Sequence, residues 1–438
     1  MRFKMRLKLK IILLTSLTTI TASAQKLLSG PMLAHVDMRT ARIWFQTLGE
    51  AEVKVVFSDL DSTTIRSKSQ CTKKESFYIA LIELDSLQPN TIYNYKVYIS
   101  NNAIPFPSPL RFVTNVDWAY RMDPPAFDLM TGSCAYFNEE KYDRPGKPYG
   151  QSTKIFQTMA NFKPDFMLWL GDNTYLRPAD FNSLFGYASR YTHSRSQPDL
   201  QTFLSTCPHY AIWDDHDYGP NDANGSHPFK KWSHKVFSAF WPNAFIGSLN
   251  EHDITGYVDL NGIDLFMLDN RTYRQQPGKE ASMLGKPQIE WLIQNLKYSN
   301  SPFKLVAVGG QVLNSYADYE NMSVYENERE YLLNRIREEK IKNIVFLTGD
   351  RHHTELSKVD LGEGIEVYDF TCSPLSSGTK PEKYRNEPNM HRVNGTNFFE
   401  NNFGILRFSG PQNERRLQIL VYSADGELAW ERTINSTK

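Results

Sequence analysis

Acidic, phenolic and imidazole side chains follow directly on three apolar runs of this 438-residue chain. The runs are 166–170, 210–213 and 344–347, and the residues after them include Asp172, Tyr175, Asp215, His216, Asp350 and His352. A charged group at the end of a buried strand is unfavourable unless it is paired or binds a metal. In α/β sheets, ligands bind outside the carboxyl ends of the strands. Three such ends lying together would offer oxygen and nitrogen donors for one or two metal ions.

The first motif is Gly171-Asp-Asn-Thr-Tyr175. Asp172 follows its strand directly and could bridge two cations, while Tyr175, three residues later, can lie on the same side. A phenolate ligand needs a strongly Lewis-acidic ion, and Fe(III) suits it better than zinc or magnesium. The alternative is that Asp172 caps a following helix.

The second motif is Trp213-Asp-Asp-His-Asp-Tyr-Gly-Pro-Asn-Asp222. Asp215 is a candidate metal ligand, and His216, which lies between carboxylates, is a candidate general acid. A turn at Gly219-Pro220 would allow Asn221 or Asp222 to add a further ligand. The alternative is a structural cluster of salt bridges.

The third motif is Gly349-Asp-Arg-His-His353. In extended backbone, Asp350 and His352 would point to the same side and His353 to the other. The alternative is that His352 is only a satisfied core histidine, because carboxylate–histidine contacts are also common outside metal sites.

Two further strand ends carry candidate site residues. Cys134 closes Gly132-Ser-Cys134 and could ligate a metal as a thiolate, although a lone cysteine is more often a small buried hydrophobe. Arg271 and Arg274 follow the run 263–268 and could hold phosphate oxygens. Ordinary ion pairs are the alternative for both arginines.

Apolar strands alternate with amphipathic segments beyond residue 125, which predicts an α/β region with mixed sheets. The expected strands are 127–130, 166–170, 210–213, 257–260, 263–268, 304–308, 344–347 and 367–370, with a terminal β pair at 404–408 and 416–422. Helices are expected at about 151–161, 229–241, 286–297 and 326–338. The polar stretch 372–402 is expected to form a loop over the site.

Residues 25–114 read as all-β, because alternating runs are separated by turn residues. Leu87-Gln-Pro before a tyrosine-rich strand is typical of the corner of a fibronectin type III sandwich, and a buried Trp44 would fit that fold. A generic β segment is the alternative. With a linker near 115–125, the sequence predicts a fibronectin III-like domain over 25–118 and a catalytic domain over 119–438.

The N-terminus is expected to be a signal peptide over 1–24, cleaved after Ala24, because five basic residues precede a short apolar run and a small-residue cleavage site. The protein is then exported, to the periplasm or the medium, with no transmembrane anchor. Removing these residues changes 49 basic and 49 acidic groups into 44 and 49. This acidic balance argues against stable binding to nucleic acid. The sequence allows one disulfide among Cys71, Cys207 and Cys372 and does not decide whether it forms.

Together these motifs resemble the alkaline phosphatase D family of the calcineurin-like metallophosphoesterase superfamily. The resemblance rests on five motifs in order, at 132–134, 171–175, 213–217, 269–274 and 349–352. It implies a four-layer α/β/β/α metallophosphatase sandwich behind the fibronectin III-like domain.

The resemblance also implies Fe(III) and Ca²⁺ as cofactors. Fe(III) would be bound by Cys134, Asp172, Tyr175 and His352. Calcium would be bound by Asp172, Asp215 and Asp350, with Asn221 as a ligand of a further calcium. Oxygen donors at the second metal favour calcium on grounds of hardness.

The implied activity is hydrolysis of phosphate monoesters or diesters by attack of a metal-bound hydroxide, with release of phosphate. Arg271 or Arg274 would neutralise the developing charge, and His216 would protonate the leaving alcohol. One alternative is a phospholipase D-like or nucleotide phosphodiesterase acting on lipid or nucleotide diesters. The other is a non-catalytic exported binding protein with a decayed site.

Overall fold

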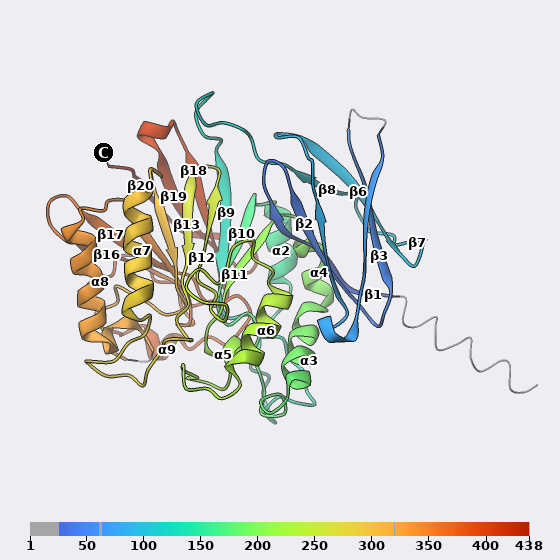
Figure 1. Cartoon of the computed structure of the whole chain (residues 1–438). Helices are drawn as coiled ribbons and strands as arrows, with labels where there is room; N and C mark the ends of the chain where they lie inside the picture. Colours follow the sequence, from blue (N-terminus) through green and yellow to red (C-terminus); the bar gives the residue numbers. More distant parts are fainter. Residues whose placement is uncertain (1–25, 61–63, 319, 438) are drawn as a thin grey trace, which may run out of the picture.

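The computed structural model describes residues 26–60, 64–318 and 320–437, and the signal peptide expected over 1–24 lies outside them. Two six-stranded sheets form the larger part of the molecule, and two smaller sheets precede them in the chain (Figure 1). Over the described ranges, no helix is long and apolar enough to cross a membrane.

The first large sheet has the strand order β11-β10-β9-β18-β19-β20. Its strands are β9 (Phe127–Gly132), β10 (Phe166–Leu170), β11 (His209–Ile212), β18 (Asn402–Ser409), β19 (Arg416–Ser423) and β20 (Leu428–Asn435). Strands β9, β10 and β11 are parallel, whereas β18, β19 and β20 pair antiparallel. The carboxyl ends of β9, β10 and β11 therefore meet at one edge, where Cys134, Asp172 and Asp215 follow them.

The second large sheet has the order β12-β13-β14-β15-β17-β16. Its strands are β12 (Gly256–Leu260), β13 (Ile263–Met267), β14 (Lys304–Ala307), β15 (Ile344–Thr348), β16 (Glu355–Asp360) and β17 (Glu366–Thr371). The inner strands are parallel, and the edge strands β12 and β16 are antiparallel. The motif at 269–274 follows β13, and the motif at 349–353 follows β15.

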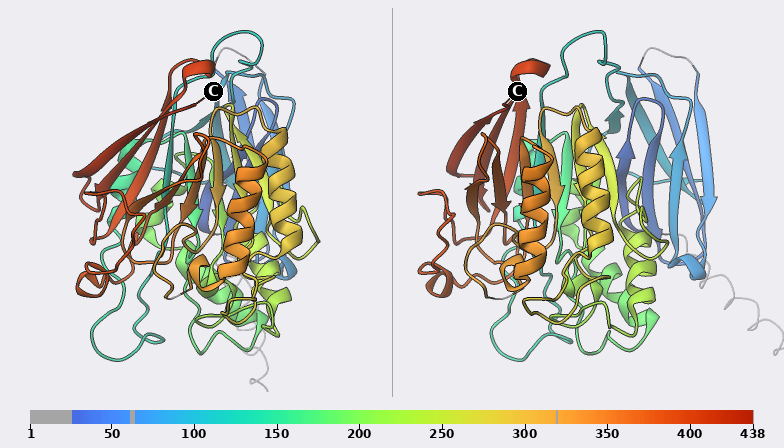
Figure 2. Two further views of the ribbon diagram at one scale, coloured as in Figure 1. Left: turned by 90° about the vertical axis from the view of Figure 1, so that its left-hand side faces the viewer. Right: turned by 60° about the vertical axis from the view of Figure 1, so that its left-hand side comes forward.

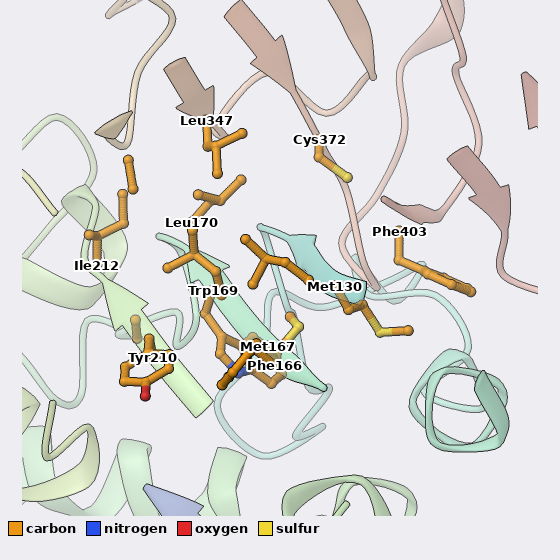
Figure 3. Close-up of a cluster of buried hydrophobic side chains, with 14 of the residues drawn as sticks. Met130, Phe166, Met167, Trp169, Leu170, Tyr210, Ile212, Leu347, Cys372 and Phe403 are labelled. Carbon is orange, nitrogen blue, oxygen red and sulfur yellow. The ribbon is translucent and has the colours of Figure 1, made fainter. Parts of the chain in front are cut away.

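The two large sheets pack face to face through aromatic and aliphatic side chains. Phe127 of β9 lies 4.9 Å from Phe408 of β18, whose ring is 5.9 Å from Phe303 at the start of β14. Figure 3 shows Leu170 of β10 pointing toward Leu347 of β15. A strand with both faces covered reads as a continuous apolar run, which explains the sequence of β10.

Helices cover the outer faces of both large sheets. The helices α7 (Lys286–Tyr298) and α8 (Glu326–Glu338) share a core with the second sheet and lie side by side outside it (Figure 2). The first sheet packs against α2 (Ile155–Phe162), α3 (Leu184–Arg195), α4 (Pro198–Leu204) and α6 (Lys230–Phe240). The short elements are α5 (Asp215–Tyr218), α9 (Pro381–Tyr384), η1 (Lys74–Ser76), η2 (Met322–Val324) and η3 (Gln412–Glu414).

The expected helices at 286–297 and 326–338 are confirmed, and α6 matches the one at 229–241 within a residue at each end. The helix expected at 151–161 begins only at Ile155. All expected strands are present, including the terminal β pair. The sequence did not predict α3, because its buried face contains Arg190 and Arg195 and so lacks an apolar repeat.

The N-terminal region forms two small sheets around a core of its own. One sheet has β1 (Leu27–Val36), β2 (Ala41–Thr47) and β5 (Ile79–Leu84). The other has β3 (Glu52–Asp59), β4 (Arg66–Cys71), β6 (Ile92–Ile99), β7 (Asn102–Ala103) and β8 (Leu110–Val113). At the expected corner, the Tyr93 hydroxyl accepts a hydrogen bond from the Gln88 backbone N–H at 2.9 Å.

Trp44 is buried as expected, but it lies outside the core of this β region. Its ring is 5.8 Å from Phe240 of α6, and its indole N–H donates to the Ala239 carbonyl at 2.8 Å. The Arg195 guanidinium lies 5.1 Å from the Trp44 ring and 3.8 Å from the Trp241 ring. Trp44 therefore joins the N-terminal region to the α/β region, because its side of the small sheet faces the helices.

Candidate metal centre

The loop after β10 is shaped by a glycine and held by one carboxylate. Gly171 has φ +92°, and a Cβ atom there would lie 2.7 Å from the Cβ of Asp214. Asp217 accepts hydrogen bonds from the backbone N–H groups of Thr174 at 3.0 Å and Asp214 at 3.1 Å. No helix begins at Asp172, so the capping alternative for that residue is wrong. Its carboxylate instead points into the site.

The side chains expected to hold Fe(III) lie together. The donor atoms of Cys134, Asp172 and His352 are all within 4.8 Å of one another, and the Cys134 Sγ is 3.7 Å from the Asp172 Oδ2. The Tyr175 hydroxyl lies 3.4 Å from the His352 Nε2. The His352 Nδ1 is 2.7 Å from the Gly378 carbonyl oxygen. That contact turns Nε2 toward the other donors.

Two further donor groups adjoin the first. The donor atoms of Asp172, Asp215 and His216 lie within 4.8 Å of one another, and so do those of Asp215, Asp222 and Glu320. Asp172 and Asp215 each belong to two groups, so the three groups form one continuous series. The Asp222 backbone N–H also donates to the Asp215 Oδ2 at 2.8 Å.

The Asp350–His352 segment is not extended, which corrects the expected reason for their alignment. Asp350 has φ +70° and His352 has φ +52°, both in the left-handed region. Cys134, at +61°, and Asp172, at +53°, share this conformation. Non-glycine residues adopt it at a cost of about 1–3 kcal/mol each, and such residues cluster at functional sites. The backbone after three strands, β9, β10 and β15, is therefore bent to turn these four side chains inward.

A cavity of about 430 Å³ opens over these groups. Its charged lining residues are Asp172, Asp215, Asp222, Glu320, Asp350, Arg274, Arg351 and Lys380. Five carboxylates therefore face three side-chain cations. His216, His352 and Asn221 also line the cavity, whereas Arg271 does not. Asp350 lines it without joining any of the donor groups described above.

The acids respond differently to this crowding. Burial, followed by the charges of neighbouring carboxylates, raises the pKa of Asp172 and of Asp350 well above the ordinary range. Burial also acts on Asp215, but His216, Arg271 and the Asp222 N–H outweigh it, and the pKa of Asp215 is lowered. Of these three acids, only Asp215 is stabilised in its ionised form by the groups around it.

The pKa values of the other proposed donors also fit a metal site. Burial, with the charge of Asp172, raises the pKa of the Cys134 thiol and of the Tyr175 phenol. Burial lowers the pKa of His352 to about 4, which leaves its imidazole neutral near pH 7. A neutral imidazole is the form that ligates metals. The thiol and the phenol would ionise only with a cation beside them.

The two candidate arginines have different surroundings. The Arg271 Nε donates to the Asp214 Oδ1 at 2.7 Å, and its Nη2 lies 2.6 Å from the Glu320 Oε2. Arg271 is thus enclosed by ion pairs behind the cavity. Arg274 lines the cavity and pairs with the Glu320 Oε1 at 2.9 Å. Its buried Nη1 has no hydrogen-bond partner within the described residues.

The candidate general acid, His216, is fixed from two sides. Its ring packs 4.3 Å from the Tyr175 ring, and its Nε2 is 4.0 Å from the Asp215 Oδ2. Because His216 also lines the cavity, its imidazole can reach a bound molecule.

A second buried group of charges, here called the rear cluster, lies behind the 349–353 loop. It comprises His353, Glu355, Glu387, Arg351 and Arg392, with Glu355 paired to Arg392 and Glu387 to Arg351. The Glu355 Oε1 also accepts hydrogen bonds from Gln311 and Asn389, each at 2.9 Å. As expected, His353 points away from the cavity, and here it lies 3.6 Å from Glu355.

The sequence did not identify several residues of the cavity wall. These are Tyr149, Glu320, Arg351, Lys380 and Tyr384. Only Arg351 lies inside a motif that could have indicated it. Lys380 and Tyr384 belong to the 372–402 stretch, which does border the site as expected. All four cysteines are free thiols, so the disulfide left open by the sequence is not formed.

Comparisons with solved structures support the fold. The structure of PhoD superposes with a TM-score of 0.74 over 95% of this chain and 93% of that one, at 18% identity. Purple acid phosphatase PPD1 from yellow lupin seeds superposes with a TM-score of 0.67 over 92% of this chain and 74% of that one, at 12% identity. The α/β region therefore has a metallophosphatase-like fold with mixed sheets.

Sequence comparisons identify the family. Alkaline phosphatase D of Bacillus subtilis (strain 168) is 24% identical over 340 residues, which cover 66% of this chain and 55% of that protein. The chain thus spans about half the length of this relative. A domain of unknown function, DUF7800, matches residues 24–114, and the PhoD-like phosphatase model matches residues 129–414. The second match covers more than half of the chain and confirms the resemblance: the chain belongs to the PhoD-like phosphatase family.

Proposed function

We propose that this protein is an exported, metal-dependent hydrolase of phosphate monoesters or diesters. One observation carries the proposal: five carboxylates and three side-chain cations line a single cavity beside the carboxyl ends of β10, β11 and β15. Such an arrangement repels a phosphate ester unless bound cations reverse the local charge. Family membership supports the same reaction class.

The donor types fit metal ions. We assign Cys134, Asp172, Tyr175 and His352 to Fe(III), because a thiolate and a phenolate favour a strongly Lewis-acidic ion. We assign Asp172, Asp215 and Asp350 to Ca²⁺, because hard carboxylate oxygens are its usual ligands. Asp172 is shared because it belongs to two donor groups. Asn221 lines the cavity and is proposed as a ligand of a further calcium.

Metal ions in such a site polarise phosphoryl oxygens and make water a stronger nucleophile near neutral pH. The protein's own groups orient the substrate and move the proton. Arg274 lines the cavity, and its Nη1 has no hydrogen-bond partner among the described residues, which leaves a donor for a phosphoryl oxygen as charge develops. Arg271 holds Asp214 and Glu320 in place.

His216 completes the reaction as the general acid. The oxygen of water bonds to phosphorus as the water loses a proton to solvent, the bond between phosphorus and the leaving oxygen breaks, and the His216 Nε2 donates a proton to that oxygen and regains one from solvent. Packing against Tyr175 and contact with Asp215 fix the imidazole for this transfer. Proton transfer by a positioned histidine is worth about 10²–10⁴-fold in rate.

The remaining expectations extend the proposal to the whole chain. The hydrogen bond from the Gln88 N–H to the Tyr93 hydroxyl is typical of a tyrosine corner and supports a fibronectin III-like domain over 25–118. The catalytic domain then covers 119–438. Residues 1–24 would direct export to the periplasm or the medium.

The proposal is tested by hydrolysis of p-nitrophenyl phosphate and its bis-ester, with and without chelator, on exported protein whose metal content is measured. Chelator-sensitive hydrolysis of the monoester would support a phosphatase. Chelator-sensitive preference for the bis-ester would support a phosphodiesterase at the same site. Metal-free protein that hydrolyses neither ester would overturn the proposal and favour the binding protein.

A matched pair of variants separates the site from general effects on the protein. Asp172→Asn removes the carboxylate shared by two donor groups. Asp425→Asn makes the same chemical change at an exposed position in the β19–β20 hairpin. Loss of metal and activity in the first variant alone would support the assignment. An active, metal-free D172N protein would contradict it.

A further inference from the structure

We propose that Lys380 forms a second anion-binding subsite, which selects substrates whose leaving alcohol carries another phosphate. The inference rests on the proposed function and names a substrate class for the same cavity. It starts from the charges of the cavity wall, which differ in how they are paired.

Two of the three cations lining the cavity are already neutralised. Arg274 pairs with Glu320 at 2.9 Å, and Arg351 pairs with Glu387. Lys380 is exposed, and no carboxylate oxygen of the described residues lies within 4.0 Å of its ammonium group. Lys380 therefore adds net positive charge to this side of the cavity.

The fold places Lys380 and Arg274 beside different donor groups. Lys380 follows Gly378 by two residues, and the Gly378 carbonyl oxygen is 2.7 Å from the His352 Nδ1. Lys380 thus belongs to the His352 side of the cavity. Arg274 is bound to Glu320, whose carboxylate lies with Asp215 and Asp222. Arg274 keeps one donor, Nη1, without a partner among the described residues, so it can still bind an oxygen of the reacting ester, while the unpaired charge of Lys380 can hold a second anionic group on the His352 side.

The short helix that begins after Lys380 is anchored by aromatic contacts. Lys380 is the N-cap of α9, and Tyr384 in the same short helix lies 5.3 Å from the Arg351 guanidinium and stacks 5.2 Å from His353. Both contacts tie α9 to the rear cluster. A subsite on a fixed wall loses less conformational entropy on binding than one on a free loop.

The cavity has room for this second group. Its volume of about 430 Å³ lies in the range of pockets that enclose a whole small ligand. Tyr149 and Tyr384 supply aromatic surface for the atoms that link the two anions. The chemistry points to a phosphorylated alcohol as the leaving group, rather than to a neutral or an apolar one.

The test compares two esters that differ only in the second anion, propyl phosphate and propane-1,3-diyl bisphosphate, on metal-loaded protein. If the protein proves to be a phosphodiesterase, both are used as methyl diesters. Lys380→Met should lower kcat/KM for the bisphosphate about five-fold, the effect of one exposed charge pair, and leave that for propyl phosphate within two-fold. The preference of the wild type should also shrink as ionic strength rises.

Lys383→Met is the matched control, because Lys383 is exposed on the same helix but does not line the cavity. The quantity compared is kcat/KM for the bisphosphate divided by kcat/KM for propyl phosphate. The subsite is supported if this ratio is unchanged in K383M and lowered in K380M. An unchanged ratio in K380M, or an equal change in both variants, overturns it while the proposed function stands. Wild-type protein that hydrolyses neither ester would instead overturn the proposed function.

Discussion

The cavity and the rear cluster are two buried charged regions built from the same loop, yet they are balanced differently. In the rear cluster, Glu355 and Glu387 are each matched by an arginine. In the cavity, five carboxylates face three cations, and one of these, Arg351, is already paired with Glu387 of the rear cluster. A buried charge needs a partner. The rear cluster provides its own partners, whereas the cavity requires partners from solution.

The difference separates two roles for buried acids. Glu355 has its pKa lowered to about 2, because contacts with His353 and Arg392 outweigh burial. Asp172 has its pKa raised by burial and by neighbouring acids. At Glu355 the lowered pKa belongs to a closed ion-pair network, whereas at Asp172 the raised pKa among like charges marks the place for a cation.

The largest expected effect is that of D172N on the cavity. Loss of the shared carboxylate should abolish hydrolysis and reduce metal content, measured by elemental analysis. In metal-free protein the same change removes like-charge repulsion, so the thermal unfolding temperature should stay equal or rise. A lower unfolding temperature of metal-free D172N would show that the protein's own cations already balance the charges of the cavity acids.

The next effect is that of E355Q on the rear cluster. Breaking a buried pair leaves Arg392 without its charge partner and should lower the free energy of unfolding by about 3–5 kcal/mol. Urea titration measures this change. The folded fraction should keep its metals. Metal loss in proportion to lost activity would contradict the separation of the two regions.

A smaller loss is expected from R274M. The variant should reduce kcat about 100-fold, the effect of removing one group that stabilises developing charge. Metal content should stay unchanged, because Arg274 forms its ion pair with Glu320, which is not a proposed metal ligand. R274K should recover part of the rate, since it keeps the charge but not the fork of donors. Loss of metal from R274M would place Arg274 in the scaffold instead.

The smallest effect is the pH dependence of the rear cluster. The folded pKa of Glu355, about 2, lies below its ordinary value of 4.5. Its stabilisation is therefore complete above about pH 4.5 and lost as pH falls through about 2. The difference in unfolding free energy between wild type and E355Q should shrink from pH 7 to pH 3. A constant difference would mean that ionised Glu355 is not its source.

Much of the fold could be predicted from the sequence because strands buried on both faces, such as β10, leave continuous apolar runs. The edge strands β16 and β20 were missed, since partly exposed strands contain polar residues. The helix α3 was missed because its buried arginines mask the apolar face. Trp44 was assigned to the wrong core, because a pattern shows that a residue is buried but not which neighbour covers it.

The candidate site was predictable where chemistry follows a strand end. Asp172, Asp215 and His352 do border one cavity, as strand order requires. Glu320 and Lys380 could not be predicted, because they enter from loops whose path depends on tertiary contacts. Sequence spacing also failed for Asp350 and His352, whose positive φ angles replace the extended backbone that alternation assumed.

The proposed ligands come from both large sheets: Cys134, Asp172 and Asp215 follow strands of the first, and Asp350 and His352 follow β15 of the second. An ion held by both sets of ligands would cross-link the two sheets at one edge. Sliding or separation of the sheets would then require the ion to dissociate first. The loaded protein should therefore unfold more slowly than the metal-free one, which would lengthen its lifetime where no chaperone can refold it.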